Sequence, residues 1–365
     1  MSGRRPLGIV ILGLSITSSW GNGHATNYRA LVRALHRRGH EVTFLERDVP
    51  WYAAHRDVEG ALDDQTELYT SMEELRDRFE PLVREADVVI VGSYVPDGIE
   101  LARWVTSAAR GVTAFYDIDT PVTVAALDTG ACGYLTPELI PRFDLYLSFT
   151  GGPMLKVIER RYGSPHAHAF HCFVDADEYR PAQVERRWDL GYLGTYSDDR
   201  QPALEELLLE PARRASHSQS FVIAGPLYPE SISWPENVER IDHVAPADHS
   251  AFYNAQRLTL NVTRADMVRA GWSPSVRLFE AAACGVPVIS DWWEGLDSFF
   301  RPGVEIFVAR TASDIEHHLA TLDEDVRHAV GDAARDRVLR AHTGDHRAAQ
   351  LEELVTPLSR GTCTA

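Results

Sequence analysis

The segment from Gly271 to Asp291 holds the side chains with the most definite chemistry in the chain. Ser273 suits the position before a helix and the proline after it suits a first helical residue, so we expect a helix over Pro274–Ala283. The start of such a helix offers partial positive charge to phosphate oxygens. Glu280, seven residues after Ser273, is expected on the same helix face, where a carboxylate suits paired sugar hydroxyls. The alternative is that Glu280 only pairs with Arg277 within the helix.

A glycine-rich turn, residues 18–24, follows the first apolar run. In a doubly wound sheet this turn lies at the carboxyl edge, where ligands bind. Glycine lets the backbone approach a ligand closely and leaves helix N–H groups facing it. The three-glycine fingerprint of dinucleotide-binding proteins is absent, and the alternative is a plain tight turn. The residues expected to contact a substrate are Trp20, Gly21, Asn22 and Gly23.

His24 ends this turn and is a candidate general base. Imidazole titrates near neutrality and can accept the proton of a hydroxyl group. Asp117 or Asp119, at the end of another strand, is expected to orient it, and Asp119 is also a candidate acceptor contact. The alternative is a histidine that only bonds to the backbone at a helix start.

Several other side chains have weaker claims to a site. His166, His168 and His171 alternate, but no carboxylate completes a metal site, and we expect no metal. Aromatic residues after two of the strands could stack on a substrate or only pack: Trp51, Tyr52, Trp292 and Trp293.

The first half of the chain alternates short apolar runs with helical patterns, which is typical of a parallel sheet. Strands are expected at Leu7–Leu14, Glu41–Glu46, Asp87–Val91, Val112–Tyr116, Asp144–Phe149 and His166–Phe170. Helices are expected at Ala25–Arg38, Met72–Glu85, Gly98–Arg110 and Pro153–Tyr162.

The second half repeats this alternation. Strands are expected at Leu190–Leu193, Phe221–Ala224, Leu258–Val262, Val286–Ser290 and Ile306–Val308. Besides Pro274–Ala283, helices are expected at Pro202–Ala215, Pro246–Ala255, Ala312–Leu322, Asp323–His342 and Asp345–Val355. The pattern predicts an α/β protein with two Rossmann-like, doubly wound domains, residues 1–172 and 183–342, followed by a C-terminal helix and tail, 343–365.

Composition limits the partners. The net charge is -17, which disfavours nucleic acid and anionic membranes as partners. The apolar run Leu7–Ile16 is too short to span a bilayer and lacks a cleavage site typical of secretory leaders. The four cysteines, Cys132, Cys172, Cys284 and Cys363, are widely spaced and read as reduced thiols, so a cytoplasmic protein is expected.

The segment Ser275–Asp291 resembles the donor-binding segment of the group-1 glycosyltransferases, and more closely that of the CgeB-like (spore-maturation) glycosyltransferases. Further likenesses follow in the family's order: the first turn and helix through Gly39–Phe44, the linker His171–Asp175 with Tyr179–Pro181, and the loop Gly194–Ser197 with Arg200. The resemblance implies a GT-B fold, in which two facing Rossmann-like domains form a cleft. The C-terminal domain would hold a nucleotide sugar and the N-terminal domain an acceptor.

The resemblance also implies roles for single residues. Glu280 would bind the donor ribose, and Arg200 would stabilise the leaving phosphate without a metal. The other donor-binding residues would be Gly194, Thr195, Tyr196, Ser197, His243, Val244, Ser273, Ser275 and Val276. The co-substrate would be a UDP- or dTDP-sugar, and the acceptor a hydroxyl or amine.

One departure from the group-1 pattern weakens the resemblance. The family places an earlier glutamate before the one at Glu280, but Ala270, Gly271 and Trp272 stand there. Retention or inversion at the sugar is therefore left open. Two alternatives remain: a nucleotide-sugar epimerase or hydrolase of the same fold, and a non-catalytic protein that binds sugar nucleotides.

Overall fold

The computed structural model describes residues 5–58, 62, 65–215 and 219–359. The chain forms two compact units. The first contains Met1–His171 together with Gly344–Ala365, and the second contains Cys172–Thr343. Cys363 lies outside the described residues, and the other three cysteines are free thiols.

The first unit is built on a seven-stranded, fully parallel sheet with the strand order β3-β2-β1-β4-β5-β6-β7. Its inner strands are nearly continuous runs of buried residues, as expected where helices cover both faces of a sheet. The strands are β1 Gly8–Gly13, β2 Glu41–Arg47, β3 Thr66–Tyr69, β4 Val88–Gly92, β5 Val112–Asp117, β6 Leu145–Ser148 and β7 Ala167–Ala169.

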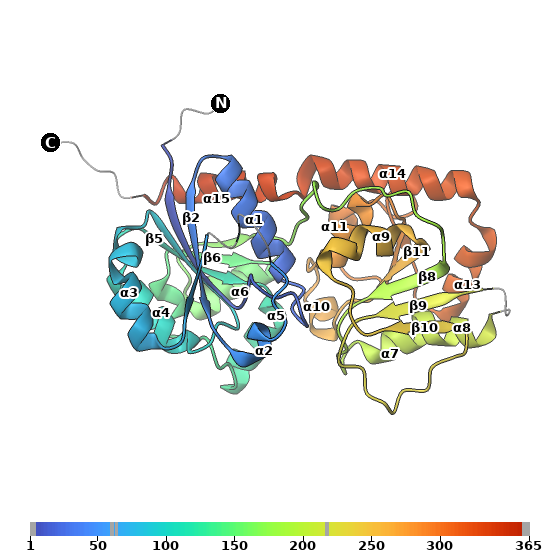
Figure 1. Ribbon diagram of the computed structural model, residues 1–365, viewed down its shortest axis with the longest axis horizontal. Coiled ribbons are helices and arrows are strands. Elements are labelled where there is room, and N and C mark those ends of the chain that lie inside the picture. The colour runs from blue at the N-terminus through green and yellow to red at the C-terminus, as the bar shows by residue number, and fades with distance from the viewer. Residues whose placement is uncertain (1–4, 59–61, 63–64, 216–218, 360–365) are drawn as a thin grey trace. The chain divides into compact units, whose positions relative to one another are not determined.

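Helices connect these strands. They are α1 Ala25–Arg37, α2 Pro50–Ala53, α3 Met72–Glu85, α4 Gly98–Ala108, α5 Thr120–Thr129 and α6 Pro153–Tyr162. The final helix, α15 (Gly344–Val355), packs beside α1 (Figure 1). The carboxylate of Glu352 on α15 accepts bonds from Arg38 at 2.5 Å and lies 2.9 Å from His40, which attaches the end of the chain to this unit.

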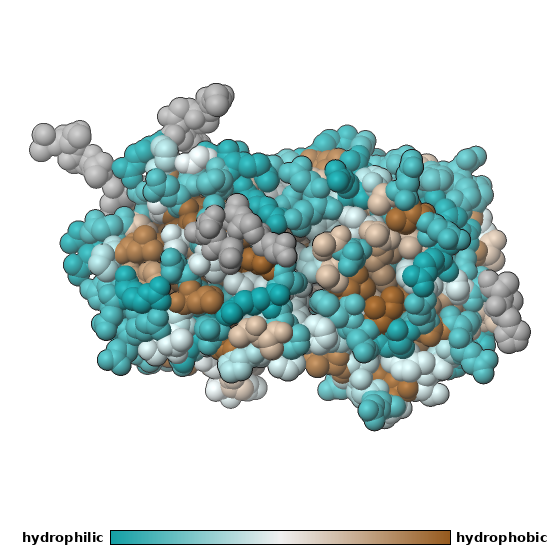
Figure 2. All heavy atoms as spheres, in the orientation of Figure 1, coloured by the Kyte–Doolittle hydropathy of each residue, from teal (hydrophilic) through white to brown (hydrophobic). Residues whose placement is uncertain are grey.

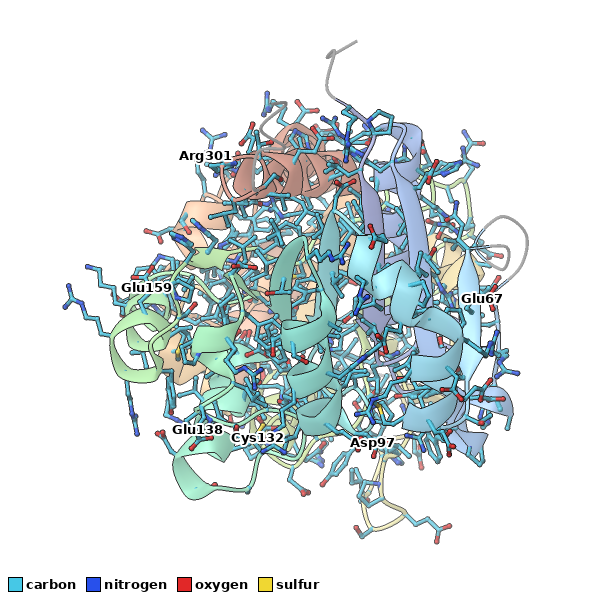
Figure 3. All side chains as sticks on the ribbon, turned by 90° about the vertical axis from the view of Figure 1, so that its left-hand side faces the viewer. Glu67, Asp97, Cys132, Glu138, Glu159 and Arg301 are labelled. Atoms are coloured by element: carbon cyan, nitrogen blue, oxygen red, sulfur yellow. The ribbon has the colours of Figure 1, made fainter. Side chains whose placement is uncertain are left out.

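Of the two edge strands of this sheet, the sequence predicts β7 but not β3. Glu67 on β3 and Glu159 on α6 lie on opposite sides of the unit, and Asp97 at the start of α4 lies at its lower edge (Figure 3). The strand β3 was not predicted, because its four residues include two polar ones and only one is buried. The helix α5 was also not predicted, since its β-branched residues do not show a clear helical period.

The second unit contains a six-stranded parallel sheet with the order β10-β9-β8-β11-β12-β13. The strands are β8 Trp188–Leu193, β9 Phe221–Ala224, β10 Val238–Ile241, β11 Gln256–Asn261, β12 Val288–Ser290 and β13 Phe307–Val308. The predicted segments for this half match all of these strands except β10, where charged residues interrupt the apolar pattern.

The helices of the second unit are α7 Gln201–Leu204, α8 Glu210–Arg214, α9 His249–Asn254, α10 Ala265–Ala270, α11 Val276–Ala283, α12 Leu296–Phe299, α13 Ala312–Thr321 and α14 Glu324–Ala341. The long helix α14 packs against α11, which lies beside it in Figure 1. A guanidinium nitrogen of Arg335 on α14 donates to the carbonyl of Ala283 at the end of α11. This contact holds α11, the helix with the predicted binding residues, in place.

Both units are therefore doubly wound parallel α/β structures, as the sequence predicts. The face shown in Figure 2 is dominated by polar residues, with apolar side chains in small groups over each unit. Among the described helices, none is both long enough and apolar enough to cross a lipid bilayer.

Candidate functional site

The first candidate site lies at the carboxyl edge of the second unit, where β8 ends and the loop 194–200 begins. The N–H of Gly194 donates to the carbonyl of Ala224, which joins this loop to the end of β9. A Cβ atom on Gly194 would lie 2.6 Å from Nη2 of Arg277, and one on Gly225 would lie 2.1 Å from the carbonyl oxygen of Gly194. Only glycine at these two positions lets the loops touch and leaves room for Arg277.

Two guanidinium groups meet on the side chain of Tyr192. Nη1 of Arg200 donates to the Tyr192 hydroxyl at 3.2 Å, and Cζ of Arg277 lies 4.5 Å from the centre of the Tyr192 ring. Burial alone would raise the pKa of Tyr192, but the two positive charges lower it below its ordinary value. The edge of this sheet is therefore strongly electropositive.

Neither arginine has an acidic partner within 4 Å among the residues that the structure describes. Arg277 instead donates from Nε to the carbonyl of Leu193 and from Nη1 to Oδ1 of Asn261 at 2.8 Å. The buried Nε of Arg200 has no hydrogen-bond partner among the described residues. Positive charge that is buried and left uncompensated suits an anionic ligand.

A carboxylate on the loop itself fixes its shape. Asp199 accepts bonds from Nε of Arg264 at 3.3 Å and from the N–H of Ala265 at 3.2 Å. Although burial opposes it, the hydroxyl of Ser197 and the charge of Arg264 lower the pKa of Asp199. The predicted residues Thr195 and Tyr196 belong to the same loop, and the N–H of Tyr196 donates to the carbonyl of Pro226.

The helix α11 starts later than the sequence analysis expects. Ser273 was predicted to cap it, but Ser275 is the residue that precedes its first turn. The chain before it is turned by Trp272, whose φ is +43° and whose N–H donates to the carbonyl of Glu294. The hydroxyl of Ser275 donates to Oδ1 of Asn261 at 2.6 Å and does not cap the helix. The first-turn N–H groups, including that of Val276, therefore have no side-chain cap.

Glu280 was expected on the same helix face as the residue that caps α11. Because Ser275 and not Ser273 precedes the first turn, Glu280 does not share a face with the helix start. Only five positions separate it from Ser275, so it does not lie beneath the helix start. Its buried carboxylate accepts a bond from the hydroxyl of Tyr253 on α9 at 3.0 Å, and also bonds with Tyr179. The alternative pairing with Arg277 is wrong, because that guanidinium points to Leu193 and Asn261.

A short chain of hydrogen bonds leads from Glu280 to the loop after β10. The Tyr179 hydroxyl lies 2.9 Å from Nδ1 of His249, and Nε2 of His249 lies 3.1 Å from the carbonyl oxygen of Val244. Burial and the Glu280 charge raise the pKa of Tyr179 well above its ordinary value. The loop residues predicted to meet a nucleobase, His243 and Val244, are thus connected to the predicted ribose contact.

The second candidate site is the turn between β1 and α1 in the first unit. Asn22 organises this turn: its Oδ1 accepts from the N–H of His24 at 3.2 Å and its Nδ2 donates to the carbonyl of Ser15. The buried carboxylate of Glu46, at the end of β2, accepts from the N–H groups of Ile16 and Thr17. These bonds fix the turn that ends at His24, the residue just before α1.

The glycines of this turn are exposed and face open space. Gly21 has a φ of +61°, and neither it nor Gly23 has a neighbour within 4 Å of where a Cβ would lie. The ring of Trp20 stacks on His55, with centroids 4.6 Å apart. The ring of Trp51, which is half-exposed, lies 6.1 Å from that of His55. These rings form a partly exposed aromatic group beside the turn.

His24 lies beside an acidic group, as predicted. Its Nε2 is 4.0 Å from Oδ2 of Asp119, and the same carboxylate oxygen accepts from the hydroxyl of Tyr94 at 3.1 Å. The ring of His24 also packs at 5.8 Å from that of Phe149. A quarter of the His24 side chain is exposed, so it can reach a substrate.

Asp117 does not share this position, and its prediction as a partner of His24 is wrong. Its side chain is fully buried. Its two oxygens are occupied by the hydroxyls of Tyr146 and Thr123 and by the N–H of Asp119. Burial outweighs these bonds and raises the pKa of Asp117 to about 6.

The other histidines show no metal site. Among the described residues, no cluster of three or more His, Cys, Asp or Glu side chains could hold a metal ion. The rings of His166 and His168 stack at 6.5 Å. His171 is half-buried, and its removal from water lowers its pKa to about 4. Its Nδ1 lies 2.7 Å from the carbonyl oxygen of Phe149.

Comparison with known proteins gives a family match over part of the chain and a fold for the whole of it. Residues 200–353 match the family model described as "Glycosyl transferase-like". A sucrose-phosphate synthase from Thermosynechococcus elongatus is similar in structure, with 15% identity, a TM-score of 0.68 and coverage of 97% of this chain and 99% of that one. The Anabaena protein HepE, in complex with UDP-glucose, has 13% identity and a TM-score of 0.69, with coverage of 96% of this chain and 100% of that one. An alpha-glucosyltransferase in complex with UDP-glucose and DNA has 14% identity and a TM-score of 0.72, with coverage of 96% of this chain and 100% of that one.

The fold is GT-B. The identities are too low for these structures to show more than the fold. No curated protein matches the chain in sequence. Within this GT-B chain, the family match begins at Arg200 and includes both Arg277 and Glu280, whereas Gly194–Ser197 precede it.

Sequence reasoning missed three residues of the electropositive edge. Tyr192 and Asn261 were treated only as parts of strands, and Arg277 only as a helix partner of Glu280. A signal was present, because Asn261 and Tyr192 are polar residues near the carboxyl ends of neighbouring parallel strands, β11 and β8. The organising role of Glu46 was likewise hidden within a predicted strand.

Proposed function

We propose that this chain is a glycosyltransferase that moves a sugar, of the hexose type, from a nucleoside diphosphate to a hydroxyl or amine acceptor. The observation that carries the proposal is the pair of uncompensated arginines, Arg200 and Arg277, at the carboxyl edge of the second unit. This unit contains most of the segment that matches the glycosyl transferase-like family. The sequence likeness to the CgeB-like branch supports a place within that branch.

The second unit would bind the donor. The guanidinium of Arg200 and the uncapped first turn of α11 would bind the diphosphate and neutralise the charge that develops as it leaves. Glu280 would accept bonds from the ribose hydroxyls, in exchange for one of its tyrosine partners. The backbone near His243 and Val244 would meet the nucleobase.

The first unit would bind the acceptor and supply the base. Nε2 of His24 would accept the proton of the attacking group, and Asp119 would stabilise the imidazolium that forms. The glycine-rich turn and the ring of Trp20 would position the acceptor. The net result is one new glycosidic bond and a free nucleoside diphosphate.

The donor is proposed to be a UDP- or dTDP-sugar, used without a metal. Two of the similar structures, HepE and the alpha-glucosyltransferase, are described as complexes with UDP-glucose. Fixed guanidinium groups can stabilise a leaving diphosphate, which a metal ion does in other enzymes. The expected result is full activity after exhaustive treatment with EDTA.

The acceptor is proposed to be a small molecule in the cytoplasm. The alpha-glucosyltransferase structure includes DNA. This chain, in contrast, has a net charge of -17, and such a charge repels the phosphate backbone of a nucleic acid. Within the first unit, arginines near the candidate acceptor site are paired with acids, as in Arg29 with Asp57 and Arg56 with Asp48.

Two rival functions make different predictions. An epimerase or hydrolase of the same fold would convert the donor with no acceptor present. A non-catalytic protein, which the missing first glutamate would favour, would bind the nucleotide and convert nothing. Where the group-1 family has its first glutamate, this chain has Gly271 and Trp272. Neither side chain has a carboxylate that could accept a bond from a sugar hydroxyl.

The function is tested by incubating the purified protein with UDP-glucose, dTDP-glucose and other nucleotide sugars, with and without a pool of small-molecule extracts. Mass spectrometry would follow the donor and any new glycoside. The proposal predicts release of nucleoside diphosphate that depends on an acceptor and is unchanged by EDTA. Conversion of donor alone to an isomeric sugar would assign an epimerase instead.

A further inference from the structure

Arg277, at the carboxyl edge of the second unit, differs from two other buried arginines of the chain, Arg29 and Arg327. Arg29 and Arg327 are equally buried, but each has a carboxylate within 3 Å: Asp57 at 2.5 Å and Glu324 at 2.9 Å. Arg277, which is only 7% exposed, has no such neighbour among the described residues. Its burial without an acid is costly in the absence of a ligand.

The groups that hold Arg277 are all neutral. Its Nε bonds to the carbonyl of Leu193, its Nη1 bonds to Oδ1 of Asn261, and its plane lies over the ring of Tyr192. Its Nη2, beside Gly194, has no hydrogen-bond partner within the described ranges. The position and orientation of the guanidinium are thus fixed, while its charge is left uncancelled.

Asn261 is the key neutral partner. It is fully buried, and its Nδ2 donates to the hydroxyl of Ser290 at 2.9 Å, which orients the amide so that Oδ1 faces Arg277 and Ser275. An aspartate of the same size would accept the same two bonds but would neutralise the arginine. Only an amide at this position both holds Arg277 and preserves its charge.

The nearby acid Asp291 does not take this role. Its oxygens accept bonds from the N–H and the hydroxyl of Thr263, at 3.0 and 2.8 Å. Burial raises the pKa of Asp291, although its hydrogen bonds and the charge of Arg277 act in the opposite direction. Among the described residues, no ion pair within 4 Å joins Asp291 to Arg277.

We infer that Arg277 is a second diphosphate-binding residue, acting together with Arg200, and that Asn261 is a positioning residue that keeps its charge available. This inference rests on the proposed function for the identity of the ligand, a nucleoside diphosphate. Two fixed positive charges match the charge of a diphosphate better than that of a monophosphate.

The test uses the full chain and compares three probes by titration calorimetry: UDP, uridine and inorganic pyrophosphate. Asn261→Asp should weaken UDP and pyrophosphate binding by about tenfold or more, which corresponds to about 1.4 kcal/mol, and should leave uridine binding unchanged. Asn237→Asp is the matched control: it makes the same substitution just before β10, where Asn237 donates to the carbonyl of Ala212, and it should leave UDP and pyrophosphate binding unchanged.

A second pair of variants covers the case in which Asn261→Asp fails to fold, as judged by circular dichroism and thermal unfolding. Arg277→Met should weaken UDP and pyrophosphate binding but not uridine binding, and Arg277→Lys should restore part of the affinity. A lysine keeps the positive charge, although it loses the fixed fork geometry.

The possible outcomes separate the inference from the proposed function. Wild-type binding of UDP that neither variant weakens would overturn the inference and leave the function standing. Selective loss in both variants, in a protein that binds UDP but transfers no sugar, would support the inference and overturn the function. A wild-type chain that binds neither UDP nor pyrophosphate would overturn both.

Discussion

Nε2 of His24 lies 4.0 Å from Oδ2 of Asp119, so an imidazole just before α1 faces a carboxylate that follows a different strand, β5. Parallel strands bring such residues together because all their carboxyl ends meet at one edge of the sheet. A base that is held by an acid in this way is a common arrangement for activating a hydroxyl group.

His24→Ala is expected to lower the turnover number by about a hundredfold or more, because the acceptor would lose its proton acceptor. Binding of UDP should stay unchanged, since the donor is assigned to the second unit. Steady-state kinetics and calorimetry on the same preparation would measure both. Near-normal turnover would remove His24 from the mechanism.

Asp119→Asn tests the acid separately. The amide keeps the size of the side chain and can still accept from Tyr94, but it no longer stabilises a charged imidazole. We expect a loss of turnover that is smaller than for His24→Ala, with no further loss when the two changes are combined. Additive losses in the double variant would show that the two residues act independently.

Glu280→Ala is expected to weaken both UDP and uridine by about tenfold or more, because the ribose is common to both ligands. This pattern differs from that of the arginine variants, which should spare uridine. Tyr253→Phe is the matched control, since it removes one hydrogen bond to Glu280 but keeps the carboxylate. Unchanged uridine affinity in Glu280→Ala would contradict the ribose assignment.

Asp117→Asn should stabilise the protein at neutral pH. The folded protein raises the pKa of Asp117 from 3.8 to about 6, so the unfolded chain releases this proton first and stability falls as pH rises from about 4 to 6. A pKa difference of this size corresponds to roughly 3 kcal/mol. Thermal unfolding should therefore show equal stability for the two proteins near pH 3 and a growing advantage for the variant up to pH 6, constant above it. A variant that is less stable at pH 7 would contradict this account of the buried carboxyl group.

Gly194→Ala should damage both the fold and the donor site. The added methyl group would meet Nη2 of Arg277 at 2.6 Å and the hydroxyl of Tyr192 at 2.7 Å, so one of them must move. We expect a loss of about 1–3 kcal/mol in the free energy of unfolding and weaker UDP binding. Gly133→Ala, where a methyl group would meet nothing within 4 Å, serves as the control and should match the wild-type protein in both.

The sequence predicts most elements of the fold because the buried strands of a parallel sheet are strongly apolar. Phe221–Ala224, Met72–Glu85 and Pro153–Tyr162 have the predicted bounds in the structure. The strands β3 and β10 were not predicted, because edge strands carry polar residues and lose the apolar pattern.

The candidate sites were less predictable, because burial and side-chain direction are set by tertiary contacts. The proximity of His24 and Asp119 follows from the sheet topology, so sequence reasoning could anticipate it. The start of α11 depends on the turn at Trp272, and the direction of Arg277 depends on space left by Gly194; neither can be read from spacing alone. Asp117 was misassigned because its strand position gives no sign that Tyr146 and Thr123 bury it.

The central claim is that the second unit holds a nucleoside diphosphate on its arginine pair. An experimental structure of the protein with UDP bound measures this most directly. In that structure we expect diphosphate oxygens within hydrogen-bonding distance of Arg200 and Arg277, and ribose hydroxyls bonded to Glu280. UDP bound elsewhere, with both guanidinium groups making only the contacts that they make without it, would contradict the account.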